Sequence, residues 1–238
     1  MILEIKNHFL DLIKDYDFEN EQITIKAKPL SATEAIGNPE HDDYPIQKGK
    51  EALMQAEFKG SYGQAFTDMY GDFEGSLSEI LNMDIDNNYR RAILISTINA
   101  VMRNLGHVNQ TVHCKDNDPV ICSQKLVTYV KDNYGSPKIT LIGLQPRMLE
   151  HLTKDFEIRV NDMDNDFIGK TKFGIQIDPP EKTKENIDWC DLIIATGTTV
   201  INDTITSLNN NKPIVYFGVT ISGTAKLLGL TDFCSEST

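Results

Sequence analysis

The sequence predicts an α/β fold: a Rossmann-like parallel sheet in the C-terminal part, preceded by a smaller α+β domain. The first observation is the stretch Asp191–Thr204, in which Leu192–Ala195 form an unbroken apolar run. A run without polar alternation is typical of a strand buried on both faces, as in a parallel sheet. The second observation is the rhythm after Cys122, where expected helices and strands alternate. Such alternation indicates βαβ units with right-handed crossovers.

Composition and charge limit the classes of protein that fit this chain. Its 238 residues suffice for one large domain or two small ones. The formal net charge is −12, whereas general nucleic-acid and anionic-membrane surfaces need clustered positive charge. No apolar run approaches the about 20 residues of a membrane span. Four cysteines without a dense framework suit a reducing compartment. We therefore expect a cytoplasmic protein that binds neither nucleic acid nor membrane; a homo-oligomer is compatible with the sequence.

The first domain is expected to cover residues 1–107. Its expected elements are a helix at 2–15, a strand at 23–27, a loop at 29–45, a segment of mixed periodicity at 50–58, a turn at 60–63, a strand at 64–67, a turn region at 69–75, and helices at 76–83 and 88–105. Ser76 and Glu79 have the spacing of a capping box at the start of their helix. Gly106 ends the longest helix, whose broad apolar face predicts burial.

The second domain is expected to cover residues 108–238, after a polar, irregular linker at 107–119. Its expected elements are helices at 124–133, 146–153, 182–189, 200–209 and 224–228, and strands at 138–142, 156–160, 173–177, 191–195 and 213–217. The stretch Asp191–Thr204 then reads as strand, small polar turn and helix. In open α/β sheets ligands bind at such places, because turn N–H groups and the helix dipole favour an anion.

Polar residues follow the ends of several expected strands, and parallel strands bring such ends to one edge of the sheet. The resulting candidate ligand-binding residues are Gly143, Gln145, Arg147, Asp162, Asp164, Thr196, Gly197, Thr198, Thr199, Asn202 and Thr220. Gly143 permits a tight turn, and Arg147 is a partner for an anion. Asp162 lies about 20 residues after Gly143, which is the offset at which an acidic residue of Rossmann proteins holds a ribose hydroxyl. Because Gly, Thr, Asp and Asn are also ordinary loop residues, the cluster and not any single member carries the prediction.

Several well-known motifs are absent from the sequence. A GxGxxG fingerprint and a GxxxxGK[ST] phosphate loop are missing, so neither a dinucleotide pyrophosphate nor an ATPase of that kind is specifically indicated. Ser222 does not lie in a GxSxG elbow, which gives no support to an α/β-hydrolase nucleophile. No catalytic residue can be assigned, because acid–base chemistry depends on geometry.

The second notable stretch is Thr111–Cys122, with one histidine, two cysteines and two aspartates within a dozen residues. Imidazole and thiolate suit zinc, nickel, copper and iron, so His113, Cys114 and Cys122 are the candidate metal ligands. The alternative is a reduced, buried cysteine pair at a domain junction. Cys190 is expected in the core, and Cys234, in a polar tail, is given no role.

Four stretches together resemble the heavy-metal-chelation family, formerly a family of unknown function. These are Tyr44–Asp68, Tyr89–Gly106, Thr111–Cys114 and Ala195–Ile205, in the family's order. The resemblance implies a domain like the enolase N-terminal domain, a Rossmann-like domain after it, and a site between the two. It also implies that Asn99, Thr196, Gly197, Thr198 and Asn202 line this cleft.

Two functions follow from these observations. One is a protein that chelates a transition metal, or a metal complex, in the interdomain cleft. The other is an enzyme or sensor for a small anionic or nucleotide-like metabolite bound at the strand ends. An anionic metal chelate on the Thr196–Thr199 turn would unite them, whereas a purely structural role fits the polar strand-end cluster less well.

Overall fold

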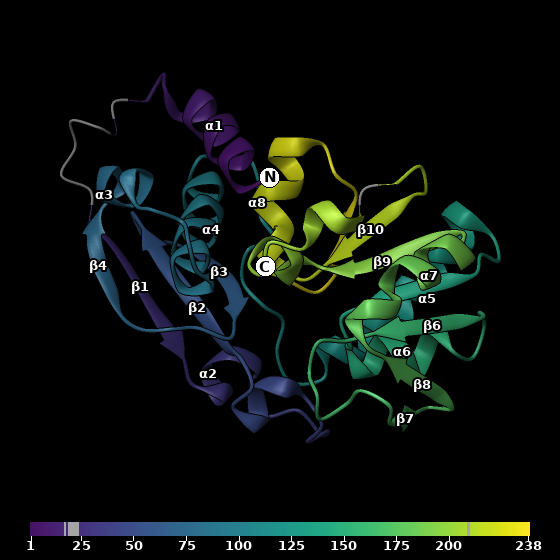
Figure 1. Ribbon diagram of the computed structural model, residues 1–238. Helices are drawn as coiled ribbons and strands as arrows, with labels where there is room; N and C mark the ends of the chain where they lie inside the picture. Colours follow the sequence, from purple (N-terminus) through teal and green to yellow (C-terminus); the bar gives the residue numbers. More distant parts are fainter. Residues whose placement is uncertain (17, 19–23, 209) are drawn as a thin grey trace.

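Two sheets lie side by side in the computed structural model, which describes residues 1–16, 18, 24–208 and 210–238 (Figure 1). The first part of the chain forms a four-stranded antiparallel sheet, and the second part forms a seven-stranded, mostly parallel sheet. Helices α1 (Ile2–Ile13), α4 (Asn88–Asn104) and α8 (Ser222–Leu228) lie between them. The predicted fold class is therefore confirmed.

The antiparallel sheet has the strand order β3-β2-β1-β4. Its strands are β1 (Thr24–Leu30), β2 (Ala52–Phe58), β3 (Ser61–Thr67) and β4 (Phe73–Ser76), and α3 (Leu77–Asn82) follows the last of them. Helix α4 packs closely on β3, because a Cβ at Gly63 would lie only 2.1 Å from the backbone N of Ala100. The middle of α4 is buried on every side, since the sheet covers one flank and α8 the other.

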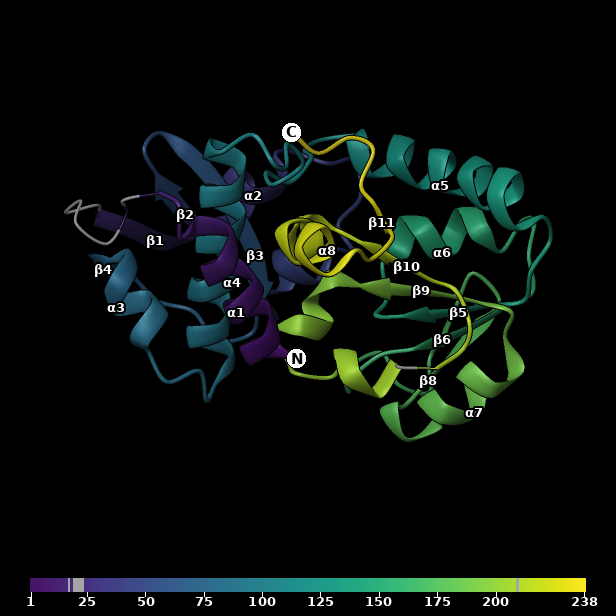
Figure 2. The same ribbon diagram turned by 90° about the horizontal axis from the view of Figure 1, so that it is seen from above.

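The parallel sheet has the order β11-β10-β9-β5-β6-β8-β7, and only β7 runs antiparallel to its neighbour. Its strands are β5 (Ile139–Ile142), β6 (Ile158–Asn161), β7 (Thr171–Lys172), β8 (Ile175–Asp178), β9 (Leu192–Thr196), β10 (Ile214–Phe217) and β11 (Asp232–Phe233). Without β7 this is the Rossmann order, with the topological switch point between β5 and β9. Helices α5 (Asp118–Tyr134) and α6 (Pro146–Leu152) cover one face, and α7 (Thr183–Trp189) covers the other (Figure 2).

One apolar cluster crosses from one sheet to the other. It joins Met54 of the antiparallel sheet, Phe9 of α1 and Ile98 of α4 to Ile193 of β9. A second cluster packs α5 and α6 against the far face of the parallel sheet. The two-domain division at residue 107 stays a prediction, because the core is continuous across it. Within the described residues, no helix is both long and apolar enough to span a bilayer.

Several elements differ from the sequence predictions. The helix expected at 200–209 is wrong: residues 197–200 and 205–208 form separate 3₁₀ turns, and residue 209 lies outside the described part. Asp203 between them has φ of +59°, which interrupts a right-handed helix. The loop expected at 29–45 contains α2 (Ala32–Ile36), which Ser31 begins with a capping box. The turn region at 69–75 includes most of β4, and α5 begins six residues before the predicted helix.

Candidate functional site

The carboxyl edge of the parallel sheet brings two predicted residues together at the switch point. Gly143 follows β5 with φ of +85°, and a Cβ there would lie 2.5 Å from Cγ2 of Thr196, at the end of β9. The N–H of Gly143 donates to the carbonyl oxygen of Asn161 at 2.9 Å. Gln145 caps α6, because its side-chain oxygen accepts a hydrogen bond from the N–H of Met148 at 2.6 Å. Local backbone thus engages the polar groups of this turn.

The turn after β9 uses its own polar side chains. The hydroxyl and N–H of Thr198 lie 3.1 and 3.3 Å from Oγ1 of Thr196, and Thr199 Oγ1 donates to the Thr196 carbonyl oxygen at 2.9 Å. The side chain of Asn202 contacts Thr204 Oγ1 at 2.6 Å in either amide orientation. Because residues 197–200 form one 3₁₀ turn, the α-helix dipole expected to attract an anion there is missing.

Asn99, expected to line the cleft, is fully buried between the sheets. Its Nδ2 donates to the carbonyl oxygens of Gln64 at 2.9 Å and Val219 at 3.1 Å, and its Oδ1 accepts from the N–H of Gly223 at 2.8 Å. A Cβ at Gly223 would come within 2.7 Å of that Oδ1. The amide of Asn99 is thus occupied by backbone groups of both parts of the chain.

Two more predicted site residues serve the contact between the sheets. The hydroxyl oxygen of Thr220, 1% exposed, accepts a hydrogen bond from the N–H of Phe66 in β3 at 3.0 Å. A Cβ at Gly197 would lie 2.7 Å from the backbone N of Ile221. Glycine at position 197 therefore lets the turn after β9 approach residues 219–221 closely.

Carboxylates gather at the end of β6. Asp162 accepts hydrogen bonds from the N–H groups of Leu144 at 2.6 Å and Asp164 at 2.7 Å, and burial raises its pKa. Burial, and then the charge of Asp162, raise the pKa of Glu51 to about 7. Asp164 lies 3.6 Å from Lys50 Nζ. The local charge at this point does not favour an anionic ligand.

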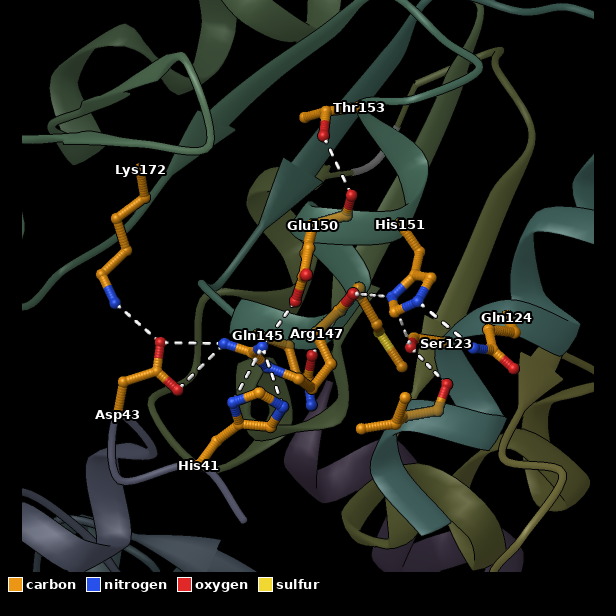
Figure 3. Close-up of polar contacts among 12 residues, drawn as sticks. His41, Asp43, Ser123, Gln124, Gln145, Arg147, Glu150, His151, Thr153 and Lys172 are labelled. Atoms are coloured by element: carbon orange, nitrogen blue, oxygen red, sulfur yellow. Dashed lines mark hydrogen bonds and ion pairs between the residues drawn. The ribbon is translucent and has the colours of Figure 1, made fainter. Parts of the chain in front are cut away.

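Arg147 is the centre of a polar cluster that joins the loop before residue 44 to α6 (Figure 3). Its side chain is 5% exposed, and its Nη2 lies 3.1 Å from both carboxylate oxygens of Asp43. Its Nη1 lies 2.5 Å from Glu150 Oε2 and 3.3 Å from both ring nitrogens of His41. Lys172 Nζ also contacts Asp43, at 3.1 Å. Asp43 and Glu150 therefore neutralise the charge of Arg147, which was the predicted partner of an anionic ligand.

The cysteines of the linker, of the start of α5 and of the C-terminal tail are all buried. Cys114, Cys122 and Cys234 are 8%, 4% and 9% exposed, and all are free thiols. Burial, then Cys234, then Cys122 raise the pKa of the Cys114 thiol, and the pKa of Cys234 rises to about 12 mainly through burial, with Cys122 adding to it. The three thiols are thus within electrostatic reach of one another. Cys234, in the tail and without a predicted role, is buried as well, and Cys190 lies in the core as expected.

His113 lies beside this cluster and keeps one nitrogen without a partner. Its ring meets Phe66 edge-on at 5.1 Å, and its backbone N–H donates to Gln64 Oε1 at 2.6 Å. Burial lowers its pKa to about 4, so the imidazole is neutral at pH 7. Among the described residues, its Nδ1 and the hydroxyl of Tyr44 are buried polar atoms without a hydrogen bond. Tyr44 is close enough to Cys114 for that thiol to influence its pKa.

The described part of the chain has no preformed metal-coordination site. Across residues 1–16, 18, 24–208 and 210–238, no group of three or more His, Cys, Asp or Glu side chains is arranged to hold a metal ion. Two depressions of about 420 and 470 Å³ flank residues 107–109, and neither is lined by a cysteine or by residues 196–202. Sequence reasoning missed Cys234, Glu51 and Tyr44, because only the fold brings them to their neighbours.

Comparison with known proteins agrees with this architecture. Residues 127–228 match the model of the family DUF364, described as "Putative heavy-metal chelation". A DUF364 protein of unknown function from Pyrococcus horikoshii is 18% identical, with a TM-score of 0.56, over 92% of this chain and 80% of that one. A second, from Desulfitobacterium hafniense, is 14% identical, with a TM-score of 0.50, over 75% and 72%. No curated protein matches the chain. The resemblance to the heavy-metal-chelation family that the four sequence stretches indicate is therefore confirmed.

Proposed function

We propose that the chain binds a transition-metal ion through Cys114 and Cys122, with His113 beside them, where two domains of residues 1–107 and 108–238 meet. One observation carries this proposal: the linker and α5 bring two buried thiols within electrostatic reach of each other. The description of the matching family supports the same class of ligand.

The residues at this place fit a soft or borderline ion. Thiolate sulfur and neutral imidazole nitrogen are the donors that zinc, copper, nickel and iron accept. The buried Nδ1 of His113 has no hydrogen-bond partner among the described residues. Burial holds the thiols of Cys114 and Cys122 in the neutral form, so both would have to release their protons to solvent in order to bind an ion.

The test is the metal content of the protein purified from rich medium without a metal-affinity tag. Elemental mass spectrometry of the wild type is expected to give near-stoichiometric zinc, nickel, copper or iron, and the double variant Cys114→Ser/Cys122→Ser is expected to lose it. Cys190→Ser is the matched control, since Cys190 is equally buried but bonds the carbonyl oxygen of Ile187 at 3.4 Å in the core. A wild type that holds no metal and takes none from a titrated panel overturns the proposal.

A second candidate function concerns the switch point, where Rossmann-type sheets bind their ligands. The strand order that creates this point supports it. Since Glu51 and Asp162 lie near each other and Arg147 is neutralised, we propose a small ligand with hydroxyl or cationic groups in place of the expected anion. Thermal-shift screening of nucleosides, sugars, amines and organic anions tests this, and Thr198→Val is expected to abolish any shift. A response to anions alone would contradict the charge argument.

A further inference from the structure

The antiparallel part of the chain meets the parallel sheet at two separate places along the carboxyl edge of that sheet. The first place is the segment after β10, residues 219–223. Its backbone binds the buried amide of Asn99, and its Thr220 hydroxyl binds the N–H of Phe66. The large apolar cluster continues beside these contacts through α4 and α8. Because its contacts are buried, this place fixes the two parts of the chain against each other.

The second place is the segment 41–50, which leads into β2 and contacts the start of α6 and residues 162–172. Lys48 Nζ lies 5.5 Å from the centre of the Phe167 ring. Each contact across this place involves a charged side chain, and part of it is drawn in Figure 3. The ion pairs are Asp43–Arg147 and Asp43–Lys172 at 3.1 Å, Lys50–Asp166 at 2.6 Å and Lys50–Asp164 at 3.6 Å.

The segment 41–50 is anchored by apolar side chains on the side of the first contact. Tyr44 and Ile46 are each 7% exposed. They pack in a small cluster that also holds Leu53 of β2 and Val219. The segment is therefore held to the antiparallel sheet, and its charged side chains are the groups that reach toward α6 and residues 162–172.

The switch point lies between the two places of contact. In the strand order, β10 and β6 stand on either side of β9 and β5, so their ends are three strand spacings, or about 14 Å, apart. The N–H of Asp164 donates to one oxygen of Asp162 at 2.7 Å, and the other oxygen accepts from the N–H of Leu144 at 2.6 Å. Two hydrogen bonds thus join the ion-paired side to the turn after β5.

We propose that residues 219–223 are a pivot and that the contact of segment 41–50 with residues 147–172 is an ionic clasp, which opens reversibly and uncovers the switch point. The structure is the closed form. In the open form water solvates the charged groups of the clasp, and the apolar core at the pivot stays intact. A molecule bound at the ends of β5 and β9 enters and leaves on the clasp side. The motion belongs to the chain itself and depends on neither ligand proposed above.

A permanent contact between two domains is the competing explanation. Such a contact is expected to rest on buried apolar side chains, because exposed ion pairs contribute little to stability. The side chains of Lys50 and Asp166 are 43% and 64% exposed, and salt screens pairs of this kind. Arg147 is the buried member of the clasp, but Glu150 on the same helix stays paired with it when Asp43 leaves. The clasp can therefore open without leaving a buried cation unpaired.

Distances between spin labels on the full-length protein test the inference. Labels at Asp42→Cys and Lys170→Cys flank the clasp, and labels at Glu57→Cys and Lys226→Cys report on the pivot side; all four positions are exposed, and the native thiols are buried. We expect the first pair to show a second, longer distance, while the second pair keeps one distance. The population of the longer distance should rise about 10-fold between about 0.05 and 1 M NaCl, because the Debye length falls to about 3 Å and four ion pairs weaken together.

Two double variants separate the clasp from a general effect of charge. Asp43→Asn/Lys50→Gln removes all four ion pairs and should show the longer distance already at low salt. Asp11→Asn/Lys26→Gln is the matched control, because it also replaces one acid and one base, each from an exposed pair within the first part of the chain, and it should behave like the wild type. Circular dichroism verifies that each variant is folded.

The salt series of the wild type decides if the clasp variant does not fold. A clasp distance that either salt or the substitutions leave unchanged would overturn the inference. An equal lengthening of both label pairs would overturn it as well, because the two parts would then separate as a whole and not turn about residues 219–223.

Discussion

Replacing Asn99 by alanine is expected to weaken the contact between the two sheets without separating them, although the family resemblance implies that this residue lines the ligand cleft. The side chain is fully buried and occupies three backbone groups, the carbonyl oxygens of Gln64 and Val219 and the N–H of Gly223. The first belongs to β3, and the other two to residues 219–223 beside the parallel sheet. Loss of the amide leaves these groups without their partners inside the protein.

The structure sets the size of the effect. Each of the three lost hydrogen bonds removes about 1 to 1.5 kcal/mol, so the free energy of unfolding should fall by about 3 to 4.5 kcal/mol. That is a large part of the about 5–15 kcal/mol that holds a typical domain together. Asn104→Ala is the matched control on the same helix, because its Nδ2 makes an exposed contact of 3.1 Å with Ser61 Oγ. We expect this change to cost under about 1 kcal/mol.

Urea denaturation measures the free energy of unfolding of both variants. Circular dichroism follows the whole molecule, and fluorescence of the single tryptophan, Trp189 at the end of α7, follows the parallel-sheet side. The Asn99→Ala midpoint should fall in both signals, while the metal content stays at that of the wild type, because the amide is not available to a ligand. A loss of stability below about 1 kcal/mol, or a loss of metal from a fully folded variant, would refute this reasoning.

Three further predictions concern stability. Burial raises the pKa of Glu51 in the folded protein to about 7, above its ordinary 4.5, so folding takes up a proton and the stability of the wild type should fall as the pH rises between these values. Glu51→Gln removes this pH dependence. The melting temperature of the variant should match that of the wild type at pH 4.5 and exceed it at pH 8. Arg147→Met should lower the free energy of unfolding by about 3 kcal/mol, because it removes the cation of a buried cluster. Arg159→Met, at a side chain 35% exposed, should lower it by under about 1 kcal/mol. Equal losses in urea denaturation would contradict the central place of Arg147 in its cluster. Gly63→Ala, whose Cβ would come within 2.1 Å of the backbone, should lower the free energy of unfolding by more than about 3 kcal/mol. Gly71→Ala, whose Cβ would have no atom nearer than 3.6 Å, should unfold like the wild type. Equal urea midpoints for the two variants would refute the close packing of α4 on β3.

The fold could be predicted where burial dictates the sequence pattern. The apolar run Leu192–Ala195 predicts β9 to within one residue, because a strand covered on both faces admits no polar alternation. The helix expected after it failed because Thr and Asn side chains there bond neighbouring backbone and hydroxyl groups in place of continuing a helix. The loop expected at 29–45 missed α2, although Ser31 and Glu34 carry the same capping-box signature that predicts α3.

The candidate site could be predicted only in part, because residue types do not reveal which partners the fold supplies. The sequence places Arg147 correctly at the start of α6 but cannot show that Asp43, more than a hundred residues earlier, occupies it. It selects Cys114 and Cys122 by their proximity in sequence. Cys234 reaches the same place only because the tail folds back over α5, a contact between segments about 110 residues apart.

Three of the four stretches that carry the family resemblance meet at Gln64, a residue with no predicted role. Its carbonyl oxygen accepts from Asn99, its N–H donates to the Thr111 carbonyl oxygen at 3.0 Å, and its Oε1 accepts from the N–H of His113. The fourth stretch joins the others through Arg91, whose guanidinium donates to the carbonyl oxygen of Ile201. The resembling residues therefore fix how the two sheets dock, and through that docking they place the cysteines. A variant that loosens this contact should lose metal only as it loses the packing between the sheets, whereas a variant at a thiol should lose metal while the sheets stay docked.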